Sequence, residues 1–156
     1  MFDWCVTDLK SWLGSKDLSD LLLQLVGWRD DASENELALA QALHHYEIGP
    51  FSSVYGVILE NRPVGLIGID LRDGRLGVIQ HIVVERDCRQ SGLGKAMLRW
   101  AWDEFDAERL EAETDRESVE FYRKCGFQVQ SLGSQREGIE RFRCSKDRPL
   151  PGSEAV

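Results

Sequence analysis

The residues best suited to ligand chemistry lie in one short segment, Val83 to Lys95. Gly92 and Gly94 let the backbone come close to a ligand, because glycine has no Cβ and adopts conformations that other residues avoid. A helix that begins here presents free amides and the positive end of its dipole, and both favour an anion. Four basic side chains fall in or next to this segment: Arg86, Arg89, Lys95 and Arg99. The segment therefore predicts a site for a diphosphate group.

Two other phosphate-binding patterns do not fit this segment. A dinucleotide fingerprint needs a third glycine where Met97 stands. A P-loop needs glycine at Arg89 and serine or threonine at Ala96. For the glycine pair taken by itself, a tight turn without any ligand is the alternative interpretation.

Two blocks of the sequence, Arg89–Gly94 and Phe121–Phe127, share the pattern of a known superfamily. The first reads Arg-Gln-Ser-Gly-Leu-Gly, and the second reads Phe-Tyr-Arg-Lys-Cys-Gly-Phe. They resemble the R/Q-x-x-G-x-G/A signature and the aromatic-Tyr and Gly-Phe block of the GNAT acetyltransferase superfamily, with a resemblance that covers roughly Val54 to Cys144. It implies an α+β fold, the GNAT acyl-CoA N-acyltransferase fold, with a mixed, mostly antiparallel central sheet flanked by helices and splayed between strands 4 and 5.

The resemblance also implies acetyl-CoA as co-substrate and no metal. By position, the backbone of Ile82, Val83 and Val84 hydrogen-bonds the pantetheine arm like an added strand. The diphosphate lies on the main-chain amides of the signature segment, which comprises Arg89, Gln90, Ser91, Gly92, Leu93, Gly94 and Lys95. Asp115 falls where many relatives carry an asparagine that contacts the cofactor. This is a departure from the pattern, because a carboxylate cannot donate a hydrogen bond as an amide can.

Tyr122 is the catalytic residue that the resemblance implies. It falls on the tyrosine that, in many relatives, protonates the departing CoA thiolate, and a phenol within hydrogen-bond reach of the sulfur can do so. The alternative is an aromatic residue that only packs in the core.

No general base can be carried over from the resemblance. Relatives with a side-chain base on the preceding strand place it where this chain has Val78 or Gln80. The remaining candidates are His81, Glu85, Glu113, His44 and His45. Strand alternation places His81 on the opposite face from Gln80, where a structural histidine is the simpler interpretation. Deprotonation of the amine through water needs no side chain and is the interpretation we favour.

Hydrophobic periodicity and turn residues predict the elements that position these groups. Helices are expected over residues 18–28, 33–46 and 92–107, with a further short helix that ends at Gly126. Ser33 with Glu36, and Thr114 with Glu117, resemble capping boxes. Strands are expected over residues 2–6, 54–60, 64–71, 76–84, 109–114, 127–132 and 139–144.

Composition and charge limit the classes of function. The 156 residues make one domain, expected over residues 1–146, followed by a flexible C-terminal tail over residues 147–156. A net charge of −8 and a pI of about 4.9 argue against nucleic-acid binding, and no apolar run is long enough to cross a membrane. No signal peptide is visible and the four cysteines are scattered, so we expect a cytoplasmic protein with reduced thiols. A homodimer interface lined by tryptophan is an alternative to tryptophan packing in the core.

The charge is unevenly distributed along the chain. Residues 86–99 hold four basic side chains and one acidic, whereas residues 1–60 hold three basic and ten acidic. We therefore expect an N-acetyltransferase that moves the acetyl group of acetyl-CoA to a primary amine by direct attack in a ternary complex, with a cationic acceptor drawn to the acidic N-terminal part. The alternatives are a non-catalytic acyl-CoA sensor, an acetyltransferase for protein N-termini or lysines, and a small nucleotide-binding domain, which the predicted hairpins disfavour.

Overall fold

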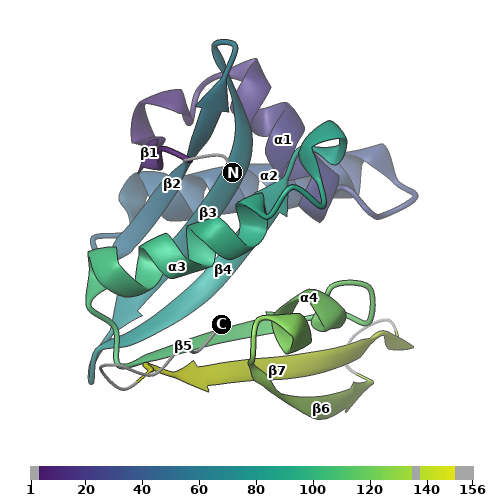
Figure 1. The fold of residues 1–156 in the computed structure, drawn as a ribbon. Coiled ribbons are helices and arrows are strands. Elements are labelled where there is room, and N and C mark those ends of the chain that lie inside the picture. The colour runs from purple at the N-terminus through teal and green to yellow at the C-terminus, as the bar shows by residue number, and fades with distance from the viewer. Residues whose placement is uncertain (1–3, 135–137, 150–156) are drawn as a thin grey trace.

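A single sheet of seven strands forms the centre of the molecule, in the order β1-β2-β3-β4-β5-β7-β6 (Figure 1). The computed structural model describes residues 4–134 and 138–149. The strands are β1 (Thr7–Asp8), β2 (Ser52–Leu59), β3 (Arg62–Arg72), β4 (Leu76–Val84), β5 (Arg109–Thr114), β6 (Gln128–Ser134) and β7 (Glu140–Asp147). The helices are η1 (Lys10–Trp12), α1 (Lys16–Val26), α2 (Ala32–Ile48), η2 (Arg86–Cys88), α3 (Leu93–Phe105) and α4 (Val119–Lys124).

Helices cover both faces of this sheet. In the view of Figure 1, α3 and α4 lie in front of the sheet, and α1 and α2 lie behind it. The front core includes Ile67, Ile69, Ile79, Met97 and Leu110, and the rear core includes Leu18, Leu21, Tyr46, Leu66 and Val83. Because both of its faces are covered, β3 is buried from residue 63 to residue 70.

The sheet divides beside β4. This strand pairs antiparallel with β3 over its whole length, but it pairs in parallel with β5 only from Leu76 to Ile79. Beyond Ile79 the two strands diverge, and Figure 1 shows the wedge that opens between them. We call this opening the fork, bounded by β4 residues 80–84 and β5 residues 113–114. It confirms the split that was predicted between strands 4 and 5 of a mostly antiparallel sheet.

A β-bulge lies at the apex of the fork. His81 opposes Gly68 and Ile79 opposes Ile69, so Gln80 is an extra residue in β4. The bulge interrupts the alternation of side chains, and both Gln80 and His81 hydrogen-bond to groups on the rear face. The expectation that these two side chains lie on opposite faces is therefore wrong, because it assumed an uninterrupted strand.

Several other elements begin, or are capped, at residues different from those expected. The first strand is Thr7–Asp8, whereas residues 4–6 are not in a strand and residues 2–3 lie outside the described residues. The expected capping boxes are wrong. Asp31 caps α2 by accepting from the amide of Ser33, so Ser33 is already inside the helix. Thr114 stays in the β5 ladder opposite Phe142, and this leaves the next residue, Asp115, to cap the turn before α4.

The C-terminal end of the described chain continues the sheet. β7 extends to Asp147, one residue into the segment expected as a tail. The amide of Arg148 then donates to the carbonyl of Glu108 at 2.8 Å. The rest of the expected tail, from residue 150 onward, lies outside the described residues.

All four cysteines are free, as expected, and Cys125 and Cys144 are buried. Within residues 4–134 and 138–149, no helix is long and apolar enough to span a membrane. Across the same residues, no group of three or more His, Cys, Asp or Glu side chains is placed to hold a metal ion.

Candidate active site

The fork exposes one backbone edge of β4. Ile82, Val83 and Val84 lie in this part of the strand, where β5 no longer supplies hydrogen-bond partners. An unpaired strand edge can receive an extended ligand chain in the way that it would receive another strand. One group on this edge is already engaged, because Nε of Arg89 donates to the carbonyl of Val84 at 3.1 Å. Arg89 thus ties the loop that follows β4 back to the mouth of the fork.

The loop after β4 leads into the start of α3. Gln90 and Gly92 have left-handed backbones, with φ values of 62° and 86°. Ser91 closes the loop by donating from Oγ to the carbonyl of Cys88 at 2.6 Å. No side chain caps the helix, and Gly92 accepts its first described backbone bond from Ala96. The amides of the residues between them, Leu93, Gly94 and Lys95, are left at the uncapped N-terminus, where an anion is favoured.

Glycine is needed at positions 92 and 94 for different structural reasons. A Cβ at Gly92 would meet nothing within 4 Å, so only its left-handed backbone requires glycine. A Cβ at Gly94 would lie 2.9 Å from Cε1 of Phe121. Gly94 therefore permits the contact between α3 and α4 across the open end of the fork, a packing role in addition to the expected approach of a ligand.

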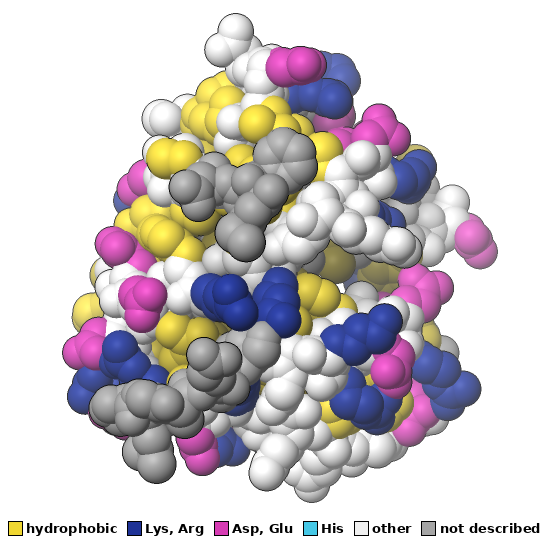
Figure 2. All heavy atoms as spheres, viewed as in Figure 1, with side chains coloured by type: hydrophobic (Ala, Val, Ile, Leu, Met, Phe, Trp, Pro, Cys, Tyr) yellow, Lys and Arg dark blue, Asp and Glu magenta, His cyan; other side chains and the backbone are white. Residues whose placement is uncertain are grey.

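A basic cluster borders the uncapped helix. Lys95 and Arg99 on α3 and Lys146 on β7 are close enough to interact: burial lowers the pKa of Lys146, and the charges of Lys95 and Arg99 lower it further. Lys146 donates from Nζ to the carbonyl of Cys125 at 2.9 Å. Figure 2 shows Lys and Arg side chains gathered on the face that carries α3 and α4. The sequence placed the positive charge in residues 86–99 but missed Lys146, because β7 joins the cluster only through the fold.

Tyr122 lies on α4 among aromatic rings. It is 4% exposed, and its ring centroid lies 5.2 Å from that of Phe121 and 5.3 Å from that of Phe127. Among the described residues, no hydrogen bond joins its hydroxyl to another group. Burial raises the pKa of Tyr122, with smaller contributions from Cys144 and Cys125. The phenol therefore keeps its proton at neutral pH and can donate it.

Asp115 is occupied at the end of β5. Its Oδ1 accepts from the amide of Ser118 at 3.0 Å, and its carbonyl accepts from the amide of Val119 at 3.0 Å. The carboxylate thus satisfies a donor at the start of α4, a role for which aspartate suits as well as asparagine.

His81 forms a buried pair with Tyr46 on the rear face. The Tyr46 hydroxyl lies 2.5 Å from Nδ1 of His81. Burial lowers the pKa of His81 to about 4, assisted by His45 and opposed by Asp70. Burial also raises the pKa of Tyr46. Tyr46 therefore donates and a neutral His81 accepts through Nδ1, which matches the structural interpretation of this histidine.

A second set of hydrogen-bonded polar side chains on the rear face is centred on Asp70 of β3. The Asp70 side chain is only 9% exposed, and its two oxygens lie 2.8 and 3.0 Å from Nε2 of His45. Gln80 donates from Nε2 to Oδ2 of Asp70 at 3.0 Å. Asp70 was not among the predicted site residues, although it is the single charged residue between Val64 and Leu71, and a charge in an otherwise apolar strand is a signal visible in the sequence.

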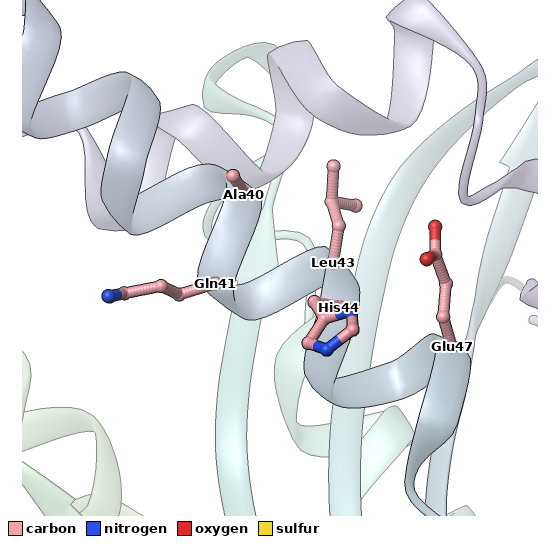
Figure 3. Close-up of a pocket in the computed structure, with 5 residues that line it drawn as sticks. All are labelled: Ala40, Gln41, Leu43, His44 and Glu47. Atoms are coloured by element: carbon pink, nitrogen blue, oxygen red, sulfur yellow. The ribbon is translucent and has the colours of Figure 1, made fainter.

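The other base candidates are spread over the molecule. Glu85 accepts from Gln24 of α1 at 2.8 Å, beyond the end of β4. Glu113 lies in β5 at the fork, with Arg143 3.9 Å away. His44 lies on the outer side of α2, in an open depression of about 520 Å³ lined by residues of that helix alone (Figure 3). The structure therefore places His81 and Glu113 in the strands that bound the fork, connects His45 to Gln80 only through Asp70, and leaves His44 on the outer side of α2.

Strand register gathers carboxylates on the rear face of the fork. Asp70 opposes Val78, and Val78 in turn opposes Glu111, so the three side chains share a face. Glu113 lies on the same face two residues further along β5. Glu113 thus lies at the fork, whereas Asp70 and Glu111 lie beside its apex. Glu111 is paired with Arg109 at 3.0 Å, and Glu113 lies 3.9 Å from Arg143.

A sheet split beside its fourth strand, with an uncapped helix at the open end, defines the fold of the GNAT acetyltransferases. A family model described as Acetyltransferase (GNAT) family matches residues 18–127, and the chain therefore belongs to this family. No curated protein sequence matches the chain significantly.

Solved structures with this fold resemble the chain over nearly its whole length. An aminoglycoside 6'-N-acetyltransferase complexed with coenzyme A is 17% identical, with 94% of this chain and 99% of that chain covered and a TM-score of 0.71. The aminoglycoside 6'-N-acetyltransferase from Enterococcus faecium is 18% identical, with the same coverage and TM-score. The PaiA N-acetyltransferase from Thermoplasma acidophilum, in complex with coenzyme A, is 12% identical, with 94% and 100% coverage and a TM-score of 0.72.

Proposed function

We propose that this protein transfers the acetyl group of acetyl-CoA to a primary amine by direct attack in a ternary complex. The observation that carries the proposal is the end of the β4–β5 pairing at Ile79, which leaves a free strand edge leading to the uncapped start of α3. A single extended ligand with a peptide-like arm and a diphosphate fits both features. That similar structures were solved with coenzyme A supports this ligand.

Each part of the co-substrate has a place in this proposal. The backbone of Ile82, Val83 and Val84 binds the pantetheine arm, and the amides from Arg89 to Lys95 bind the diphosphate. Lys146 adds a positive charge that the sequence signature does not contain. Asp115 contributes by fixing the turn into α4.

Tyr122 acts as the general acid. As the acceptor nitrogen forms its bond to the acetyl carbon, the bond from that carbon to sulfur breaks. The Tyr122 hydroxyl then gives its proton to the departing sulfur and recovers one from solvent. Tyr122 keeps its proton at neutral pH, which this assignment requires.

The acceptor in this proposal is a cationic amine. The rear face carries Asp70 and Glu111 beside the apex of the fork and Glu113 at the fork, next to the acidic N-terminal helices. A cation is attracted there, whereas the phosphates of the co-substrate are attracted to the front. Aminoglycosides, named for two of the similar structures, are one class of polycationic amine to include among test acceptors.

The test measures release of free thiol from acetyl-CoA with a panel of cationic, neutral and anionic amines. We expect release with cationic amines, and we expect Tyr122→Phe to lower kcat by about 100-fold while acetyl-CoA binding measured by calorimetry is retained. Binding of acetyl-CoA without thiol release for any amine would favour the non-catalytic sensor. Equal rates for cationic and anionic amines would contradict the proposed preference for a cationic acceptor. They would leave the proposed acetyl transfer intact.

A further inference from the structure

We propose that His45, oriented by Asp70, is the general base that deprotonates the acceptor ammonium. The inference rests on the proposed acetyl transfer and adds to it a residue that neither the sequence signature nor the family supplies. An amine attacks only when it is uncharged, so a cationic acceptor must lose a proton before its nitrogen can bond to carbon.

The contact with Asp70 fixes the tautomer of His45. An ionised carboxylate only accepts hydrogen bonds, and both of its oxygens face Nε2 of His45, at 2.8 and 3.0 Å. Nε2 therefore carries the hydrogen, and in the neutral ring the lone pair is on Nδ1. Ser52 Oγ lies 3.2 Å from the same Nε2, and none of the described residues hydrogen-bonds Nδ1. Nε2 is therefore held, and Nδ1 is the nitrogen that can take up a proton.

Asp70 and His45 differ in exposure, and this difference gives them different roles. The Asp70 side chain is 9% exposed, whereas the His45 side chain is 40% exposed. The carboxylate is thus a fixed, shielded support, and the imidazole faces a molecule that arrives from solvent. A depression of about 380 Å³ is lined in part by Asp70 and Ser52, the two residues that contact His45, although His45 itself does not line it.

One hydrogen bond connects this pair to the apex of the fork. Gln80 is the extra residue of the bulge and the first β4 residue beyond the pairing with β5, and its Nε2 donates to Oδ2 of Asp70. Asp70 itself opposes Val78, next to Ile79, the last β4 residue paired with β5. The pair therefore lies on the rear face at the point where β4 and β5 separate, opposite the face that carries α3 and the basic cluster.

Charged and titratable groups surround the pair on three elements, β3, β4 and α2. On β3, an Arg72 nitrogen lies 3.7 Å from Oδ2 of Asp70 and is well exposed. On β4, His81 stays neutral because burial lowers its pKa to about 4, and Tyr46 on α2 keeps its proton because burial raises its pKa. The neighbours of the pair along α2, His44 and Glu47, lie on the outer side of that helix. Asp70 is thus the charged group in direct contact with His45.

The step balances as a simple proton transfer. One proton leaves the acceptor ammonium for Nδ1 of His45, and the freed electron pair forms the bond to the acetyl carbon. The sulfur leaves with the proton of Tyr122, and the second proton on nitrogen passes to solvent. Imidazolium His45, stabilised by Asp70, then releases its proton to solvent, and one proton is released per acetyl group transferred.

The experiment compares the pH dependence of kcat/KM for wild type, His45→Gln and Asp70→Asn, with His44→Gln as the matched control on the outer side of the same helix. We expect His45→Gln to lower kcat by about 100-fold or more and to abolish the acidic limb of the profile, while the control behaves as wild type. Removal of the charge in Asp70→Asn makes His45 less basic, so the acidic limb moves to lower pH and the maximal rate falls. An unchanged limb in Asp70→Asn would overturn the proposal.

A second acceptor separates a base from a structural residue. An amine that is already mostly uncharged at the assay pH needs no base, so His45→Gln should lose far less activity with it than with a strongly basic amine. An equal loss with both acceptors would assign His45 a structural role and overturn the proposal. Failure of wild type to release thiol with any amine would instead refute the proposed transfer, so the two failures are distinguishable.

Discussion

The Tyr46 hydroxyl lies 2.5 Å from Nδ1 of His81, and the ring that carries it occupies the space over Gly68, the residue that opposes His81 in the β3–β4 ladder. A Cβ at Gly68 would lie 1.7 Å from the Tyr46 oxygen. The absence of one side chain on β3 thus allows a residue of α2 to reach a residue of β4. This contact fixes α2 against the rear face of the sheet, where the proposed base is carried.

Gly68→Ala should therefore destabilise the protein by about 2 kcal/mol or more, because the buried Tyr46 ring cannot remain in place. Urea unfolding measures the change in the free energy of unfolding. Gly14→Ala is the control, since a Cβ there would meet nothing within 4 Å and its free energy of unfolding should be close to that of wild type. Equal stability of the two variants would contradict the arrangement of Tyr46 described above.

The buried His81 should make stability depend on pH. Its pKa is lowered from 6.5 to about 4 on folding, so the unfolded state binds the proton more tightly. The associated stability is present above pH 6.5 and is lost as the pH falls toward 4. Between pH 7 and pH 5 wild type should lose about 2 kcal/mol more than His81→Gln, which cannot titrate in this range. Parallel curves of unfolding free energy against pH for the two proteins would contradict a buried, neutral His81.

The contact between Gly94 and Phe121 should be energetically coupled. Gly94→Ala places a Cβ 2.9 Å from the Phe121 ring, and we expect a loss of about 1–3 kcal/mol in stability together with weaker binding of acetyl-CoA, because the start of α3 is displaced. Phe121→Leu should relieve the clash, so the double variant should lose less than the two single losses combined. Strict additivity in the double-mutant cycle would show that the two residues do not touch.

The Lys146 side chain should contribute to the affinity for acetyl-CoA. Loss of its charge in Lys146→Met should weaken binding about fivefold, equivalent to about 1 kcal/mol, and should reduce the dependence of the dissociation constant on salt. Calorimetric titration at two salt concentrations measures both. Lys16→Met removes the same charge at an exposed position on α1, behind the sheet, and should leave the dissociation constant unchanged.

Local sequence patterns predicted the strands that frame the site. Leu76–Val84 and Arg109–Thr114 begin and end where the alternation of apolar residues and the turn residues indicated. The start of α3 was also predicted within one residue, because Gly92 and Gly94 mark it. In these places the signal lies within a few neighbouring residues, and the tertiary structure only confirms it.

The acceptor side could not be predicted in the same way. The bulge at Gln80 depends on how β4 is paired with β3, and the alternation rule fails from that residue onward. The contact of His45 with Asp70 joins residues that are 25 positions apart. His44 and His45 are equivalent in a sequence, and only the packing of α2 turns one toward the sheet and the other toward solvent. Pairings between elements thus carry the information that local periodicity lacks.

The open edge of β4 has a consequence for the behaviour of the protein in solution. Free amides and carbonyls along a strand edge are a template for any other extended chain, including a second copy of the same segment. Here the edge extends over only five residues, 80–84, and the wedge narrows toward an apex closed by four paired positions. A short arm without a bulky neighbour can enter such a wedge, whereas a strand that brings its own sheet cannot. The fork therefore selects its occupant by shape and at the same time limits edge-to-edge self-association.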